Sequence, residues 1–76
     1  MQKFLVEKIQ ELAFEKVELN DPLWSSEILD SITIVELAVE IEKKYNIEVP
    51  FDEIIEDNFE TVAKLMNYIT QKVEAK

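Results

Sequence analysis

Hydroxyl and carboxylate side chains are the groups with which this chain could do chemistry, because it has no histidine and no cysteine. Without cysteine there are no disulfides, thiolate metal sites or cysteine nucleophiles. Without histidine the commonest general base and transition-metal ligand is missing. Ser31 therefore lacks an activating histidine, and the chain has no glycine for a nucleophile elbow. We expect no catalytic residue and no enzyme activity of its own.

The densest acidic stretch is DEIIEDNFE at residues 52–60, whose carboxylates are the candidates for a metal site or for a catalytic carboxylate pair. A calcium loop needs oxygen ligands at alternate positions and a central glycine, and this stretch offers neither. Paired-carboxylate catalysis needs a cleft, for which a chain of 76 residues has little room. We predict a single domain over residues 1–76, no specific metal site, and at most loose binding of divalent ions.

The charge balance is strongly acidic, with 17 acidic and 8 basic side chains and a net charge of −9. Such a surface repels nucleic acids and anionic membranes, so neither is expected as a partner. It favours a basic protein partner, unless the charge serves only solubility. No apolar run approaches the ~20 residues of a membrane span, and MQKFLVEKIQEL does not have the pattern of a signal peptide. We therefore expect a cytoplasmic protein that is monomeric.

Ser31 is placed at the start of the most regular helical pattern. Asp30 is a good N-cap, which makes Ser31 the first helical residue of a helix over residues 31–45. We expect Ile34, Leu37, Ala38, Ile41 and Tyr45 on its buried face, Thr33, Glu36, Glu40, Lys43 and Lys44 on its polar stripe, and Ile32, Val35 and Val39 at the flank. A serine here is often a plain cap, but a helix N-terminus also favours a phosphate esterified to it.

The remaining elements are also helical. Apolar spacing predicts a helix over residues 3–15, followed by a connection over 17–29 too apolar to lie free of the core. Pro50 holds Val49 extended, and residues 51–58 are predicted to form one short helical turn with Phe51, Ile54 and Ile55 inward. Thr61 caps a last helix, whose apolar positions are Val62, Leu65, Met66, Ile69 and Val73.

The fold class is all-α, a small bundle of three main helices and one short helix with a long first loop. Because the chain has no glycine, none of its turns can depend on the residue that adopts positive φ most easily.

The segment LDSITIVELAVEIEKKYNIEVP, with PLWSSEILDS before it and NFETVAKLMNYI after it, resembles the acyl carrier protein family over nearly the whole chain. In that family the serine of the Asp-Ser pair carries 4′-phosphopantetheine, derived from coenzyme A, whose thiol holds an acyl group as a thioester. The resemblance implies that Ser31 is the attachment site, with Asp30 as the adjacent motif residue. It also implies that enzymes act on the chain, against the alternative of a plain helical interaction module.

This sequence departs from the family pattern around the serine. Family members usually have a glycine three or four residues earlier, where this chain has Ile28 and Glu27, and Thr33 replaces a common acidic residue. The Leu-Asp-Ser and Pro-Leu-Trp stretches look more like specialised carriers. The primary prediction is a carrier of acyl intermediates for fatty-acid, polyketide or related synthesis. The alternative is a D-alanyl or other aminoacyl or peptidyl carrier charged by an adenylating ligase.

The resemblance also implies partners and surfaces. The expected partners are a phosphopantetheinyl transferase and acyl-transferring, ketosynthase or adenylating enzymes, which recognise the second helix. The predicted partner surface, beside Asp30, consists of Ile32, Val35, Glu36 and Glu40. The predicted cargo pocket consists of Val39, Val49, Ile54, Leu65 and Met66.

Overall fold

Amphipathic segments with clear caps form the helices of this protein. The computed structural model describes residues 1–75. The elements are α1 (Gln2–Ala13), α2 (Ser31–Tyr45), a 3₁₀ turn η1 (Phe51–Glu53), α3 (Glu56–Phe59) and α4 (Val62–Glu74). No strand occurs among these residues. The predicted all-α bundle of three main helices and a short one is confirmed, with a long first connection over residues 14–30.

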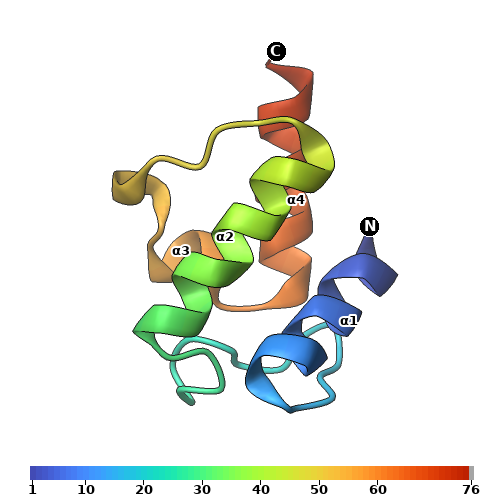
Figure 1. The fold of residues 1–76 in the computed structure, drawn as a ribbon, viewed down its shortest axis with the longest axis vertical. Coiled ribbons are helices and arrows are strands. Elements are labelled where there is room, and N and C mark those ends of the chain that lie inside the picture. The colour runs from blue at the N-terminus through green and yellow to red at the C-terminus, as the bar shows by residue number, and fades with distance from the viewer. Residues whose placement is uncertain (76) are drawn as a thin grey trace.

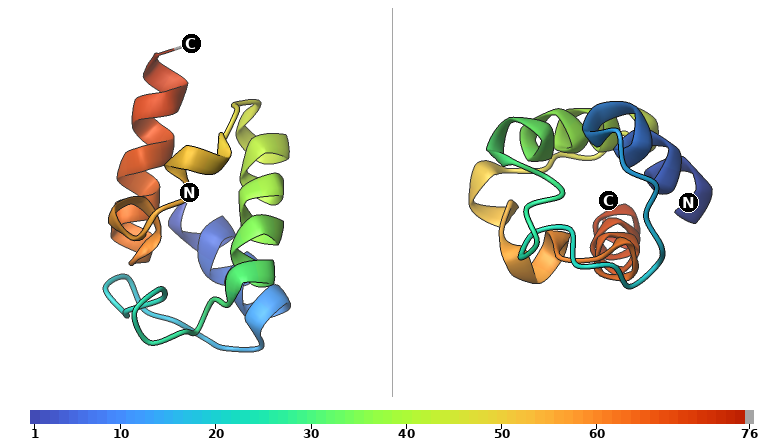
Figure 2. Two further views of the ribbon diagram at one scale, coloured as in Figure 1. Left: turned by 90° about the vertical axis from the view of Figure 1, so that its left-hand side faces the viewer. Right: turned by 90° about the horizontal axis from the view of Figure 1, so that it is seen from below.

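The three long helices surround one core (Figure 1). α1 runs opposite to α2 and packs on both α2 and α4, and α3 packs on α4. Seen from below, α1 and α2 lie along one side, α4 stands opposite, and the first connection crosses beneath them (Figure 2). The fully buried side chains include Leu5 and Ile9 of α1, Leu37 and Ile41 of α2, and Leu65 and Ile69 of α4. These one-turn spacings turn one face of each helix toward the others.

The first connection is part of this core. Leu23 is fully buried, Val17 and Leu29 are buried, and Leu19, Trp24 and Ile28 pack against the core cluster, as the sequence predicted. α1 is slightly shorter at its end than predicted, because Phe14 takes a left-handed conformation (φ 59°) and its amide donates to Gln10. The connection therefore starts at Phe14 and follows the bundle to the start of α2.

Side-chain caps start α2 and α4, as predicted. The Asp30 carboxylate accepts from the Thr33 amide, and the Thr61 hydroxyl accepts from the Lys64 amide. Lys43 and Lys44 in the last turn of α2 suit the negative end of its dipole. The placing of Thr33 on the polar stripe was wrong, since its side chain is buried. Position 33 lies one turn before Leu37 and therefore at the edge of the buried face.

The second connection, residues 46–55, contradicts part of the prediction. Phe51 is 82% exposed and Ile55 is 44% exposed, so neither points inward, and Ile54 is half-buried. The Glu53 carboxylate accepts from the Tyr68 hydroxyl at 2.5 Å and from Lys72 Nζ at 3.0 Å on α4. A 3₁₀ turn has about three residues per turn, so Phe51 lies on a different side from Glu53 and turns outward. Phe59 and Tyr68 are buried instead, and Val73 is exposed.

Candidate functional site

Ser31 is the first residue of α2, and its side chain is exposed. Asp30 before it has extended backbone (φ −81°, ψ 177°), and its Oδ1 accepts from the Thr33 amide at 2.8 Å. This hydrogen bond lowers the pKa of Asp30 below its usual value. The Ile34 amide donates to the Asp30 carbonyl at 2.9 Å, which closes the first turn. The Ser31 hydroxyl is thus held at a fixed, solvent-facing helix start.

A carboxylate from the other end of the chain holds the loop before Ser31. Glu60 Oε1 accepts from the amides of Trp24 (3.0 Å) and Ser25 (2.9 Å), and Oε2 accepts from the Ser25 hydroxyl (2.6 Å). The Glu60 carbonyl also accepts from the Leu23 amide at 2.6 Å. The hydrogen bonds from Ser25 and Trp24 lower the pKa of Glu60. Glu60 therefore fixes the path of residues 23–25 toward α2.

Glu27 has a left-handed backbone (φ 61°), as do Phe14 and Asn46. These turns therefore reach positive φ without glycine, as they must in a chain that has none. A residue with a β-carbon pays about 1–2 kcal/mol for this conformation, although asparagine tolerates it better. Glu27 stands where the related family usually has glycine. The loop thus turns here without glycine, and Glu27 lines the same cavity as Ser31.

A cavity of about 520 Å³ lies beside Ser31. It is bounded by the first connection, by the first turns of α2 and by the η1 segment. Its lining residues are Trp24, Glu27, Leu29, Asp30, Ser31, Ile34, Val35, Phe51 and Ile54. Most of these side chains are apolar, and the charged ones are both acidic. The exposed hydroxyl, the positive end of α2 and the adjacent apolar walls fit a phosphate-linked organic arm.

A family model described as the phosphopantetheine attachment site matches residues 5–69, a range that includes all of α2. The chain belongs to this family. The resemblance seen in the sequence is therefore confirmed, and the protein is a carrier whose covalent cofactor is 4′-phosphopantetheine.

The relatives of this carrier include proteins that handle an amino acid. It is 35% identical over 69 residues to the D-alanyl carrier protein of Streptococcus sanguinis, covering 88% of this chain and 87% of that protein. It is 32% identical over 73 residues to the D-alanyl carrier protein of Streptococcus pyogenes, covering 93% and 92%. These relatives favour the aminoacyl alternative over the fatty-acid reading.

A solved structure has the same fold. One chain in a crystal structure described as that of an FAD-dependent dehydrogenase superimposes with a TM-score of 0.72 at 35% identity. The match covers 91% of the carrier and 97% of the solved chain, so the two chains have similar lengths. The likeness therefore extends over the whole bundle.

The predicted partner surface divides into two parts in the structure. Ile32 is 70% exposed, Val35 is 44% exposed and Glu36 is exposed, so all three are accessible beside Ser31. Glu40 is half-buried and pairs with Lys8 at 3.6 Å and Lys43 at 3.9 Å. Glu40 therefore ties α2 to α1, and its carboxylate is already engaged.

The predicted cargo pocket is not gathered around the cavity beside Ser31. Of its five residues only Ile54 lines that cavity. Val49 and Leu65 are buried in the core, Met66 is half-buried against it, and Val39 is 40% exposed. A pocket formed by these residues requires the bundle to open, and it stays a prediction.

Sequence reasoning missed Glu60 and the outward position of Phe51. Glu60 appeared only as one acid in a dense acidic stretch, and its partners lie 35 and 36 residues away. No local pattern could have signalled that contact. Trp24 is the single tryptophan of the chain, and its amide at the cavity donates to the same distant carboxylate.

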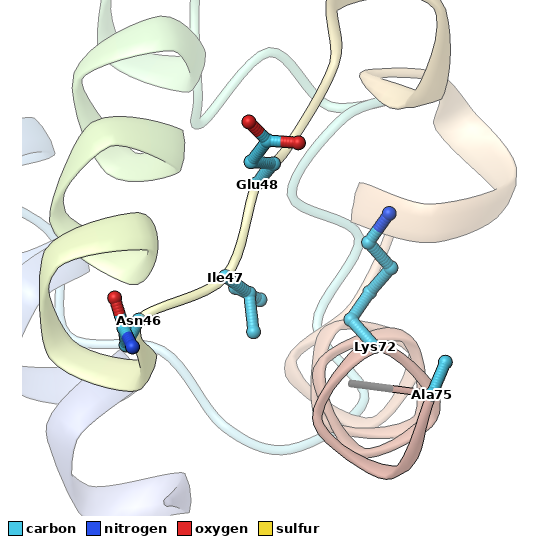
Figure 3. Close-up of a pocket in the computed structure, with 5 residues that line it drawn as sticks. All are labelled: Asn46, Ile47, Glu48, Lys72 and Ala75. Atoms are coloured by element: carbon cyan, nitrogen blue, oxygen red, sulfur yellow. The ribbon is translucent and has the colours of Figure 1, made fainter.

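A second hollow, of about 360 Å³, lies at the far end of α2 (Figure 3). Asn46, Ile47 and Glu48 line it from the second connection, and Lys72 and Ala75 line it from α4. An α-helix of 15 residues is about 22 Å long, so this hollow is remote from Ser31. Its lysine is already paired with Glu53.

Residues 1–75 contain no group of three or more histidine, cysteine, aspartate or glutamate side chains suited to hold a metal ion. Over the same residues, no helix has the length and apolar character needed to cross a membrane.

Proposed function

We propose that this chain is an aminoacyl carrier protein, with 4′-phosphopantetheine attached to Ser31 and an amino acid loaded by an adenylating ligase. One observation carries the proposal: the family match spans an exposed serine at a capped helix start, next to an apolar cavity. The D-alanyl carrier relatives favour an amino acid as cargo.

Attachment is a phosphoryl transfer onto the Ser31 hydroxyl. Ser31 Oγ attacks the phosphorus that bears the pantetheine half of coenzyme A, and a new ester bond forms. The pyrophosphate bond breaks, the nucleotide half leaves, and the hydroxyl proton passes to a base of the transferase, since this chain has no histidine. When bound, the arm supplies a terminal thiol that holds the cargo as a thioester. The chain itself is a substrate of enzymes in the cytoplasm.

The residues of this chain contribute position and charge. Asp30 fixes the start of α2, so the helix dipole favours the phosphate on Ser31. Glu60 fixes the loop that precedes it. Val49 and Leu65 are buried in the core, so a cargo sheltered beside them would require the bundle to open.

Intact-mass measurement tests the attachment site. The protein is incubated with coenzyme A, magnesium and a broad-specificity phosphopantetheinyl transferase, and a gain of one phosphopantetheinyl group is expected. Ser31→Ala should abolish the gain, whereas Ser26→Ala, an exposed serine in the same loop, should keep it. A gain that survives Ser31→Ala would refute the site.

A second measurement tests the cargo. The modified protein is incubated with ATP, D-alanine and the adenylating D-alanine ligase of one of the streptococci, and a further gain of one alanyl group is expected. In a parallel sample a long acyl chain is attached to the arm. If that chain raises the melting temperature, the core shelters it and the fatty-acyl reading gains support, because burial of a ligand stabilises only the folded state.

A further inference from the structure

The cavity beside Ser31 combines aromatic rings with carboxylates. Trp24 and Phe51 contribute rings to its lining, Glu27 and Asp30 contribute carboxylates, and none of the lining residues is basic. Its volume of about 520 Å³ is that of a pocket for a small ligand. Ser31 is itself a lining residue, so a flexible arm attached to it can fold back into the cavity. The cavity therefore offers a place for the loaded end of the arm.

The two carboxylates of the cavity differ in how far they are engaged. Asp30 Oδ1 accepts from the Thr33 amide at 2.8 Å and caps α2. Glu27 is exposed, and the ion pairs found among residues 1–75 do not include it. The Glu27 carboxylate is therefore accessible to a cationic group that enters the cavity.

The backbone at Glu27 gives separate support to a role for its side chain. Its φ of 61° is costly for a residue with a β-carbon, and the related family usually has glycine here. Glycine would make this turn without that cost. A strained residue beside a functional group motivates the hypothesis that its side chain contributes to function.

The charge of the cavity distinguishes between the two classes of cargo. An aminoacyl thioester carries an α-ammonium group, whereas a fatty acyl thioester carries only an apolar chain. An ammonium group is attracted both by a carboxylate and by the faces of aromatic rings such as those of Trp24 and Phe51. The cavity also exists without any opening of the bundle, unlike a pocket beside the buried Val49 and Leu65. An aminoacyl group therefore fits this cavity better than a long acyl chain does.

We propose that Glu27 binds the α-ammonium group of an amino acid carried on the arm of Ser31, with Trp24 and Phe51 beside it. Glu27 is then a specificity-determining residue, which favours a cargo with a free amine. A fatty acyl chain has no cation and gains nothing from this carboxylate. The inference rests on the proposed function, because it requires the arm on Ser31.

The ion pair is tested by NMR on the loaded protein. The broad-specificity transferase attaches the arm from D-alanyl-coenzyme A with a ¹³C-labelled alanyl methyl group, so no ligase is needed, and intact mass confirms the loading. A pH titration of the methyl shift gives the pKa of the alanyl ammonium group. Glu27→Gln should lower this pKa by roughly 0.2–0.7, because a nearby carboxylate favours the charged form and exposed ion pairs are weak.

Two further variants accompany this titration. Glu27→Gly should lower the pKa of the ammonium group as much as Glu27→Gln does, and glycine suits the positive φ, so the fold is kept. Glu15→Gln is the control, because it removes the same charge from an exposed residue that is not among those lining the cavity. It should leave the pKa of the ammonium group unchanged.

The position of the cargo is tested with the same samples. Nuclear Overhauser contacts should join the alanyl methyl group to the ring of Trp24 in the wild-type protein and weaken severalfold in Glu27→Gln. A propionyl group, loaded from propionyl-coenzyme A, has the same carbon skeleton without the ammonium group. Its contacts with Trp24 should be as weak as those of the alanyl group in Glu27→Gln.

Two results would overturn the inference. One is an ammonium pKa in Glu27→Gln equal to that in Glu15→Gln. The other is a propionyl group that contacts Trp24 as strongly as the alanyl group does, since apolar contact alone would then hold the cargo. Either result in a loaded protein refutes this inference alone, whereas a protein that gains no arm refutes the proposed function and this inference with it.

Discussion

The two long connections of this bundle are both held by glutamates, but in different ways. In the first, residues 14–30, Glu60 accepts from main-chain amides 35 and 36 residues away. In the second, residues 46–55, Glu42 accepts from the Val49 amide at 2.7 Å, and Glu53 binds side chains of α4. The connection that leads to Ser31 thus depends on a more distant residue than the other.

This difference gives part of the acidic composition a structural meaning. Asp30, Glu42, Glu53 and Glu60 all accept hydrogen bonds from main-chain amides or from side chains. These carboxylates satisfy hydrogen-bond donors in a chain that has no glycine, and the sequence pattern alone does not indicate which donors they bind. The net charge of −9 is therefore more than an aid to solubility.

The largest expected difference between the connections is the loss of stability when a buried apolar side chain in each is truncated. Leu23→Ala in the first connection should lower the free energy of unfolding by about 2–5 kcal/mol, because Leu23 is fully buried. Val49→Ala in the second should cost less, since it removes fewer carbon atoms. Urea unfolding measures both. A loss below about 1 kcal/mol for Leu23→Ala would contradict the view that the first connection belongs to the core.

Removal of the Glu60 carboxylate should make the first connection more mobile and leave the mobility of the second unchanged. In Glu60→Ala the amides of Trp24 and Ser25 should exchange with solvent about tenfold faster, since they lose a charged acceptor. Modification of Ser31 should slow as well. Glu56→Ala, an exposed carboxylate on α3, is the control. Unchanged exchange in Glu60→Ala would show that apolar contacts alone hold the loop.

Acid should weaken both connections. The pKa values of Glu53 and Glu60 are lowered, Glu53 by its hydrogen bond with Tyr68 and Glu60 by that with Ser25. A lowered pKa in the folded state adds stability above the unfolded value, and this is lost as pH falls below about 4.5 toward the folded value.

Melting temperatures between pH 6 and pH 3 should therefore fall, by roughly the few degrees that small changes in free energy produce in a short domain. The double variant Glu53→Gln/Glu60→Gln should show a flatter profile. A profile identical to that of the wild type would mean that other carboxylates control acid stability.

The smallest expected effects concern the left-handed residues. Glu27→Gly in the first connection should stabilise the fold by about 0.5–1 kcal/mol, because glycine adopts positive φ without steric cost. Asn46→Gly at the start of the second should change stability by only a few tenths of a kcal/mol, since asparagine already tolerates this conformation. Denaturant midpoints compare the two, and a destabilised Glu27→Gly would indicate a packing role for the glutamate.

Local signals predicted the helices of this carrier well. The start of α2 at Ser31, its cap at Asp30 and the Thr61 cap of α4 follow from neighbouring residues, so sequence was sufficient. The family resemblance was likewise recognisable from α2 and its flanking segments, and the family match confirms it.

The parts that sequence did not predict depend on distant contacts. The direction of Phe51 follows from the bond between Glu53 and Tyr68, 15 residues further along the chain. The shape of the cavity beside Ser31 depends on Glu60 in the same way. Positive φ at Glu27 has no local signal in the sequence, because glycine, the residue that usually marks such a turn, is absent from the chain. The roles of Ser31, the partner surface and the cargo pocket stay predictions.

The hydrogen bonds from Trp24 and Ser25, in the loop before Ser31, to Glu60 have a consequence for folding during synthesis. The residues of α2, Ser31–Tyr45, all leave the ribosome before Glu60, so the helix can form while its preceding loop is still unanchored. The loop before Ser31 gains these hydrogen bonds only once residue 60 has emerged and docked. A nascent chain that ends before residue 60 therefore presents the serine beside a loop that lacks its distant anchor.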